Sequence, residues 1–92
     1  MNAIQPRLEL GQLLITPAAR EALAPADVRA ALDRHAQGDW GDVTGDDREA
    51  NDEALVNEGR LFSVYHNSDG LKFWVITESD HSATTVMLPE DY

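Results

Sequence analysis

Alternating apolar and polar positions dominate the C-terminal third of the chain. Runs rich in β-branched and aromatic residues span Leu61 to His66, Leu71 to Glu78 and Ala83 to Leu88. Such residues favour strands, in which successive side chains point to opposite faces. Asn67 to Gly70 ends in Asp-Gly, which tolerates the positive φ of a tight hairpin turn, and Pro89 ends the last run because proline cannot donate to a ladder. The pattern predicts a three-stranded antiparallel meander.

The N-terminal half adds one strand and three helices to this prediction. Leu8 to Ile15 alternates around a glycine and should join the sheet. Thr16-Pro17 predicts a short helix from Pro17 to Leu23, because threonine caps free amides and proline is tolerated at the first helical position. A second helix should run from Pro25 to Gly38, and a third from about Gly45 to Asn57. Residues 1–7 have little pattern, so we expect them to be loosely ordered.

These elements predict a single α+β domain over residues 1–92. Its sheet should be four-stranded and mostly antiparallel, built from the N-terminal strand and the C-terminal meander, with two or three helices on one face. We expect Trp40 to close one end of the core, with its indole N–H bonded to backbone. The predicted core consists of residues that repeat at the period of their elements: Leu14, Leu23, Val28, Leu32, Trp40, Leu55, Phe62, Val64, Trp74, Ile76 and Val86.

Charge narrows the possible partners. The chain has 17 acidic and 7 basic residues, a formal net charge of −10. An acidic surface repels phosphate backbones, so we expect no direct nucleic-acid binding and a basic protein surface as partner. The absence of cysteine excludes disulfides and thiolate chemistry. The longest apolar run is far shorter than the roughly 20 residues of a membrane span, so we expect a soluble, cytoplasmic protein without membrane contact.

Acidic residues are concentrated in residues 39–58, which contain eight carboxylate side chains and one basic side chain. On the predicted third helix, Asp46, Glu49 and Glu53 are spaced i, i+3 and i+7 and therefore share one stripe. Two interpretations stay open: a solvated face that keeps the protein soluble, or an acidic ridge that binds a basic groove. The candidate partner-binding residues are Asp42, Asp46, Glu49, Asp52 and Glu53.

Other chemistry has less support in the sequence. Asp39, Asp42 and Asp46 lack the alternate-residue spacing of an EF-hand calcium loop, and we expect no metal or cofactor. An enzymatic alternative uses His35 with neighbouring carboxylates for acid–base work. No phosphate loop, zinc-protease helix or nucleophile elbow accompanies it. We therefore expect His35 to be a histidine at the edge of the core, hydrogen-bonded to backbone.

Three motifs carry a resemblance that covers the chain from about Leu10 onward. His35 to Asp42 (HAQGDWGD), Trp74 to Glu78 (WVITE) and Thr84 to Tyr92 (TTVMLPEDY), with Asn51 between them, resemble a family of small proteins carried by plasmids and other mobile elements. The resemblance implies a setting but no activity, and the restriction-related label of some members has no support in these residues. The element order is also similar to that of RelE-type ribonuclease toxins, which are basic, so that likeness concerns the fold.

The favoured hypothesis is a small acidic, non-catalytic interaction protein of a mobile element. It would bind a basic surface of a host protein, with its carboxylates imitating the phosphates of a nucleic acid and so inhibiting host defence. The alternative is a small hydrolase or RelE-like ribonuclease that uses His35. Charge separates the two hypotheses, because a nuclease must hold a polyanion that this surface repels.

Overall fold

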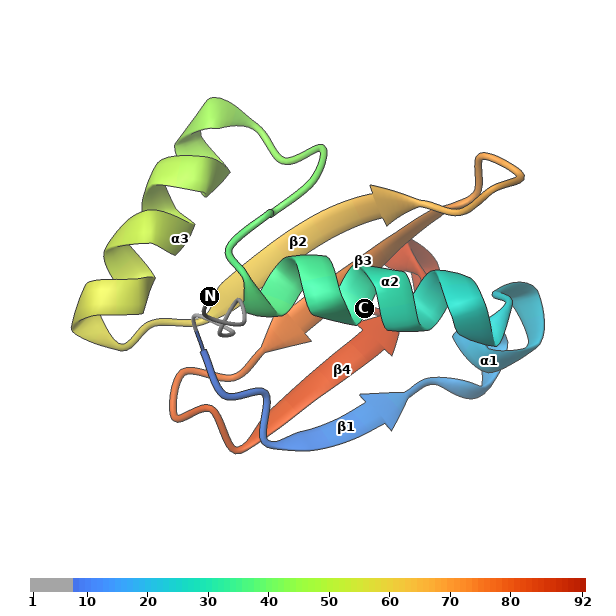
Figure 1. The fold of residues 1–92 in the computed structure, drawn as a ribbon, viewed down its shortest axis with the longest axis horizontal. Coiled ribbons are helices and arrows are strands. Elements are labelled where there is room, and N and C mark those ends of the chain that lie inside the picture. Colours follow the sequence, from blue (N-terminus) through green and yellow to red (C-terminus); the bar gives the residue numbers. More distant parts are fainter. Residues whose placement is uncertain (1–7) are drawn as a thin grey trace, which may run out of the picture.

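The computed structural model describes residues 8–92, so the expectation for residues 1–7 lies outside the described part of the chain. Three helices and a four-stranded sheet confirm the predicted α+β class (Figure 1). The third helix and the first strand of the meander have the predicted bounds. In chain order the elements are β1 (Gln12–Ile15), α1 (Pro17–Ala22), α2 (Pro25–Ala36), α3 (Gly45–Asn57), β2 (Leu61–His66), β3 (Lys72–Thr77), β4 (Ala83–Met87) and the 3-10 turn η1 (Pro89–Asp91).

The sheet has the order β1-β4-β3-β2 and is mixed. The meander of β2, β3 and β4 is antiparallel as predicted, but β1 runs parallel to β4, with Gln12 beside Ala83 and Ile15 beside Val86. The expectation of a mostly antiparallel sheet was therefore wrong for this strand. Alternation predicts that a segment is a strand, but it does not give the direction in which the strand joins the sheet. For β1 that direction depends on the path of the long segment between β1 and β4.

β1 is shorter than the predicted strand Leu8 to Ile15. Gly11 has φ of +66°, and a Cβ atom there would lie 2.3 Å from the carbonyl oxygen of His81, so the chain bends sharply where only glycine fits. Before this bend the backbone leaves the sheet, and the N–H of Leu8 donates to the carbonyl of Ala36. The segment 8–11 therefore packs against the end of α2.

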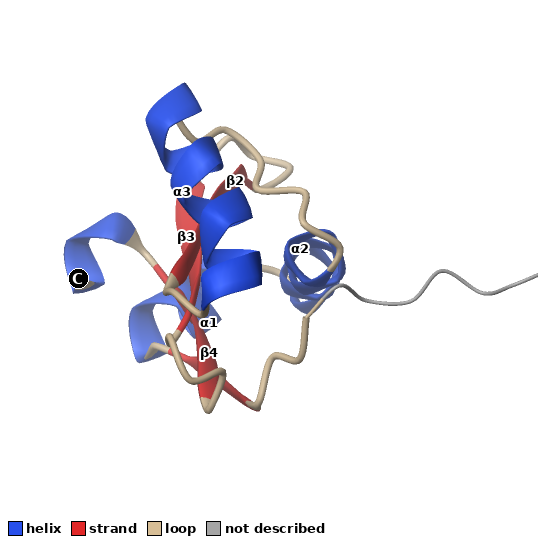
Figure 2. Cartoon of the chain, turned by 90° about the vertical axis from the view of Figure 1, so that its left-hand side faces the viewer, coloured by secondary structure: helices blue, strands red, loops and turns tan. Residues whose placement is uncertain are grey.

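α2 packs across one face of the sheet, and the C-terminal turn lies on the other side (Figure 2). The face beneath α2 holds most of the core, including Tyr65, Phe73, Val75 and Val86. A second cluster joins the loop after α2 to α3 and β2, with Trp40 buried at its centre. Trp40 is thus a core residue, as predicted.

The predicted core is confirmed in part, because Val64 and Ile76 are buried in the sheet, as are Leu23, Trp40 and Val86. Phe62 and Trp74 are only half-buried on the face opposite α2, and Leu14 is exposed. Both faces of these strands carry large apolar side chains, so alternation alone does not say which face the helices cover. The face under α2 holds the buried residues Leu61, Ser63, Tyr65, Phe73, Val75, Thr77, Thr84, Val86 and Leu88.

Candidate functional site

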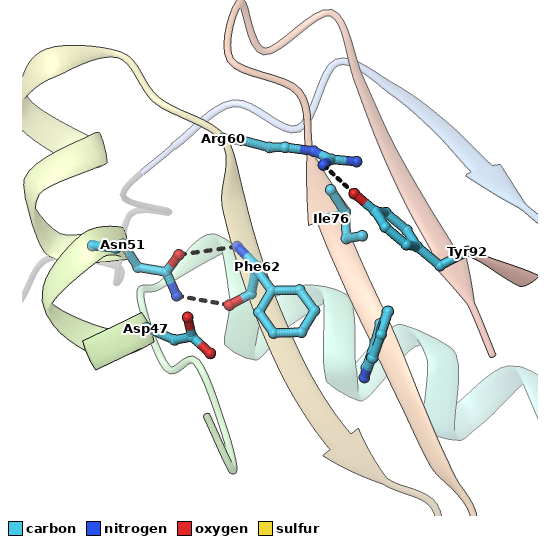
Figure 3. A pocket seen from close by; sticks show the side chains of 8 residues that line it. Asp47, Asn51, Arg60, Phe62, Ile76 and Tyr92 are labelled. Carbon is cyan, nitrogen blue, oxygen red and sulfur yellow. Dashed lines mark hydrogen bonds between the residues drawn. The ribbon is translucent and has the colours of Figure 1, made fainter. Parts of the chain in front are cut away.

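A groove of about 340 Å³ lies between α3 and the sheet face opposite α2 (Figure 3). Its apolar part is aromatic: the rings of Phe62 and Trp74 meet edge to face with centroids 5.1 Å apart, and Trp74 meets Tyr92 in the same way at 5.7 Å. Such edge-to-face contacts favour a fixed ring arrangement. The full lining is Asp47, Ala50, Asn51, Arg60, Phe62, Trp74, Ile76 and Tyr92.

Asn51 fixes α3 against the sheet edge and so sets the width of this groove. Its Nδ2 donates to the carbonyl of Phe62 at 2.7 Å, and the N–H of Phe62 donates to its Oδ1 at 3.0 Å (Figure 3). The side-chain amide thereby takes the place of a neighbouring strand at the edge of β2. Asn51 is buried and the two bonds are partly buried, so water has limited access to them.

The loop between α2 and α3 pairs with β2 one step further along its edge. The N–H of Val64 donates to the carbonyl of Trp40 at 3.0 Å, and its own carbonyl accepts from the N–H of Asp42 at 2.8 Å. Gly41 allows this approach: it has φ of +73°, and a Cβ atom there would lie 2.1 Å from the Val64 oxygen. The outer edge of β2 is thus occupied by this loop and by Asn51.

The opposite wall of the groove is held by the C-terminal residue. Arg60 Nη1 donates to the hydroxyl of Tyr92 at 2.8 Å, and the Arg60 guanidinium lies over the Tyr92 ring, 5.3 Å from its centroid. Arg60 also lies 3.8 Å from the carboxylate of Glu78. These contacts place Tyr92 beside Trp74 and close one side of the groove.

The five predicted partner-binding residues divide into two groups. Asp46, Glu49 and Glu53 are exposed on α3, and their side chains make no hydrogen bond or ion pair with any residue in the range 8–92. We call these three residues the acidic ridge. Asp42 and Asp52 are also exposed, but each has a partner. Asp42 lies 2.8 Å from His66 Nδ1, and Asp52 accepts from the Trp40 indole at 3.1 Å, in place of the predicted backbone acceptor.

The acidic ridge borders the groove. Successive residues of a helix are rotated by about 100°, so Ala50, which lines the groove, lies about 40° around α3 from Asp46 and about 60° from Glu53. Asp47 also lines the groove, and is half-buried. The acidic ridge therefore adjoins the wall that α3 contributes to the groove, and the aromatic floor lies beyond this wall.

His35 lies in the core rather than at its edge, and its partners are hydroxyls rather than backbone. The ring is fully buried, with Nδ1 2.6 Å from Ser63 Oγ and Nε2 2.8 Å from Thr77 Oγ1. Thr77 Oγ1 is in turn 2.6 Å from Thr84 Oγ1, which donates to the carbonyl of Leu10 at 2.7 Å. Desolvation lowers the pKa of His35 to about 4.

The last hydrogen bond of this buried series, from Thr84 to Leu10, determines where the protons lie in the others. Thr84 gives its hydroxyl hydrogen to Leu10, so it accepts from Thr77. Thr77 then accepts from the Nε2–H of His35, which leaves Nδ1 to accept from Ser63. A neutral imidazole satisfies every member of the chain.

The predicted pairing of His35 with a neighbouring carboxylate is not formed. Asp39 accepts from Arg34 Nε at 2.7 Å, and this hydrogen bond lowers the pKa of Asp39. Ser63 contacts His35, but both residues are inaccessible to solvent. Within residues 8–92, no cluster of three or more histidine, aspartate or glutamate side chains has an arrangement that could hold a metal, and no helix is long and apolar enough to cross a membrane.

Sequence reasoning found the acidic ridge but not the groove beside it. Alternation predicts Phe62 and Trp74 to be core residues, and no sequence pattern predicts a binding role for Arg60 or Tyr92. The meeting of Arg60 with Tyr92 depends on the path of η1 across β3, which no local sequence pattern indicates. The scan of protein-family models finds no match to the chain, and comparisons with curated proteins and with solved structures find none either.

Proposed function

We propose that the protein is a non-catalytic interaction protein that binds a basic surface of a partner protein through the acidic ridge and the adjoining groove. The observation that carries this proposal is a row of three carboxylates that have no partner among residues 8–92 and lie beside an aromatic surface. Lysine and arginine have charged ends on apolar stems. Their charged ends would meet the ridge while their stems lie against Phe62 and Trp74.

The wider setting belongs to the same proposal. The three sequence motifs suggest a mobile element, and hence a host protein in the cytoplasm as partner. The ridge carboxylates follow one another at steps of about 4.5 and 6 Å along α3, which would imitate a row of phosphates. A nucleic-acid-handling protein of host defence has the lysine- and arginine-lined groove that such a row would occupy. Occupation of that groove would inhibit the host protein.

The enzymatic alternative draws little support from the site. A general base must reach the proton that it abstracts, either directly or through one water. His35 is enclosed by the helix and the sheet and is hydrogen-bonded to Ser63 and Thr77. None of the described residues that line the accessible groove is a histidine. Its aromatic and charged lining fits the recognition of a basic side chain better than the hydrolysis of a polyanion.

A capture experiment with two charge-matched variants tests the proposal. The ridge variant carries Asp46→Asn, Glu49→Gln and Glu53→Gln. The control variant carries Glu9→Gln, Glu21→Gln and Asp69→Asn, which remove the same charge from exposed positions elsewhere. Proteins from the native host that bind the wild-type chain are identified by mass spectrometry, and their affinities for all three chains are then measured.

We expect the ridge variant to bind the captured partner about tenfold more weakly at low salt, because electrostatic steering raises association rates by roughly 10-fold or more. The control variant should bind almost as the wild type does. The difference should shrink as salt is added, since salt screens exposed charges. Equal affinity and equal salt dependence of the two variants would show that the ridge is only a solubility device.

A further inference from the structure

β1 is an open sheet edge that carries exposed aliphatic side chains. Among the strands of the described residues it is the outermost, and its partner there is β4. Leu13 is 56% exposed, Leu14 42% and Ile15 38%. An edge strand presents unpaired N–H and C=O groups, and proteins usually protect such edges with charge, proline or a covering segment. The outer edge of β2 is occupied in this way, whereas no described residue pairs with the outer edge of β1.

A second groove, of about 440 Å³, runs between β1 and α2. Leu13 and Ile15 line it from the strand, and Val28 and Leu32 line it from the helix. Leu13 and Ile15 therefore point toward the α2 side of the sheet, and Leu14 points to the other side. The groove extends the apolar surface of the open edge.

The backbone of β1 offers a self-complementary pairing. The N–H groups of Gln12 and Thr16 donate inward to β4, at 3.0 Å to the carbonyls of Ser82 and Val86. Backbone direction alternates along a strand, so the N–H and C=O groups of Leu13 and Ile15 point outward. Antiparallel pairing of two β1 strands about a two-fold axis at Leu14 would set Leu13 opposite Ile15 of the second copy and form four hydrogen bonds.

We propose that a second copy of the chain pairs with β1 in this register, so that the two sheets join into one of eight strands. Leu13 and Ile15 of both copies would then form one apolar strip beneath the two α2 helices. Charge favours this edge over others in a chain of net charge −10. Its groove is lined by Arg20, Arg29 and Asp33, so basic residues offset part of the negative charge there and reduce repulsion between copies.

Sedimentation of the full chain over a range of concentrations tests the assembly. We expect dimers that strengthen with salt, because salt screens the repulsion between two acidic copies. Leu14→Asp should weaken the dimer at least tenfold, since it places two like charges face to face, while the exposed position leaves each copy folded. If the chain sediments as a monomer at every concentration, the proposal is overturned. Another segment or a foreign strand would then be the candidate partner of β1.

Single cysteines test the register, because the chain has none of its own. At the two-fold axis the Cα atoms of residue 14 would lie about 4.5 Å apart, within the roughly 4.4–6.8 Å that a disulfide spans. Leu14→Cys should therefore form a disulfide-linked dimer on mild oxidation. Val56→Cys, which lies on α3 and is 81% exposed, is the control and should form no disulfide-linked dimer. Equal cross-linking of the two variants would overturn the proposed pairing.

Discussion

At the scale of single residues, the buried polar chain through His35 decides which face of the sheet is covered. Ser63, Thr77 and Thr84 lie among apolar neighbours under α2, where an unpaired hydroxyl is costly. His35 accepts a hydrogen bond from Ser63 and donates one to Thr77, so these polar side chains can be buried under α2. Helical spacing placed His35 on the inner stripe of α2. Its partners, 28 and 42 residues away in sequence, depend on strand register and could not be predicted.

His35 should make stability depend on pH in a defined window. Burial lowers the pKa of His35 to about 4 from the ordinary histidine value of 6.5. Between these values the unfolded chain binds a proton that the folded chain does not, so the free energy of unfolding falls as pH falls from about 6.5 to about 4. The total loss should be roughly 3 kcal/mol, and stability is fully present above pH 6.5. Urea unfolding at several pH values measures it.

The control for this prediction is His35→Gln, which lowers stability at every pH but removes the titrating group. Its unfolding free energy should change much less between pH 6.5 and pH 4.5 than that of the wild-type chain. The same slope in both proteins would contradict the assignment, because the pH dependence would then arise from other groups. His66 does not confuse the comparison, since it is present in both proteins.

At the scale of elements, the helices were predicted more closely than the strands. Local signals such as the Thr16 cap, whose hydroxyl accepts from the N–H of Ala19, mark helix starts within one turn. The length and direction of β1 depend on the bend at Gly11 and on β4, far away in sequence. The contact between α3 and β2 likewise rests on Asn51, which the sequence marked only as part of a motif.

Asn51 should therefore contribute more to stability than an ordinary helix residue. Asn51→Ala leaves the N–H and C=O of Phe62 unpaired, which should cost roughly 2–3 kcal/mol in the free energy of unfolding. Asn57→Ala, at the exposed end of α3, is the matched control and should change stability little. Hydrogen exchange at the Phe62 amide should accelerate in the first variant alone. Unchanged exchange at Phe62 would refute this account of the sheet edge.

At the scale of the whole molecule, the acidic ridge and the accessible aromatic residues lie at the same end of the protein. The acidic ridge could be predicted because Asp46, Glu49 and Glu53 are neighbours on a single helix. The groove could not, because it needs α3, the second face of the sheet and the C-terminal Tyr92 to meet. The proposed dimer edge at β1 lies at the opposite end of the sheet order, so partner binding and self-association would use separate surfaces.

The most direct test of the central claim is an NMR titration of the ¹⁵N-labelled chain with a lysine-rich peptide. The two tryptophan indole signals report on different places: Trp74 lines the groove, and Trp40 is buried with its N–H bonded to Asp52. We predict shifts at the Trp74 indole and the ridge amides, with the Trp40 indole unchanged, and loss of these shifts in the ridge variant but not in the control variant. Shifts spread evenly over the acidic positions of the chain, with Trp74 unchanged, would contradict the claim that the ridge and the groove form one binding surface.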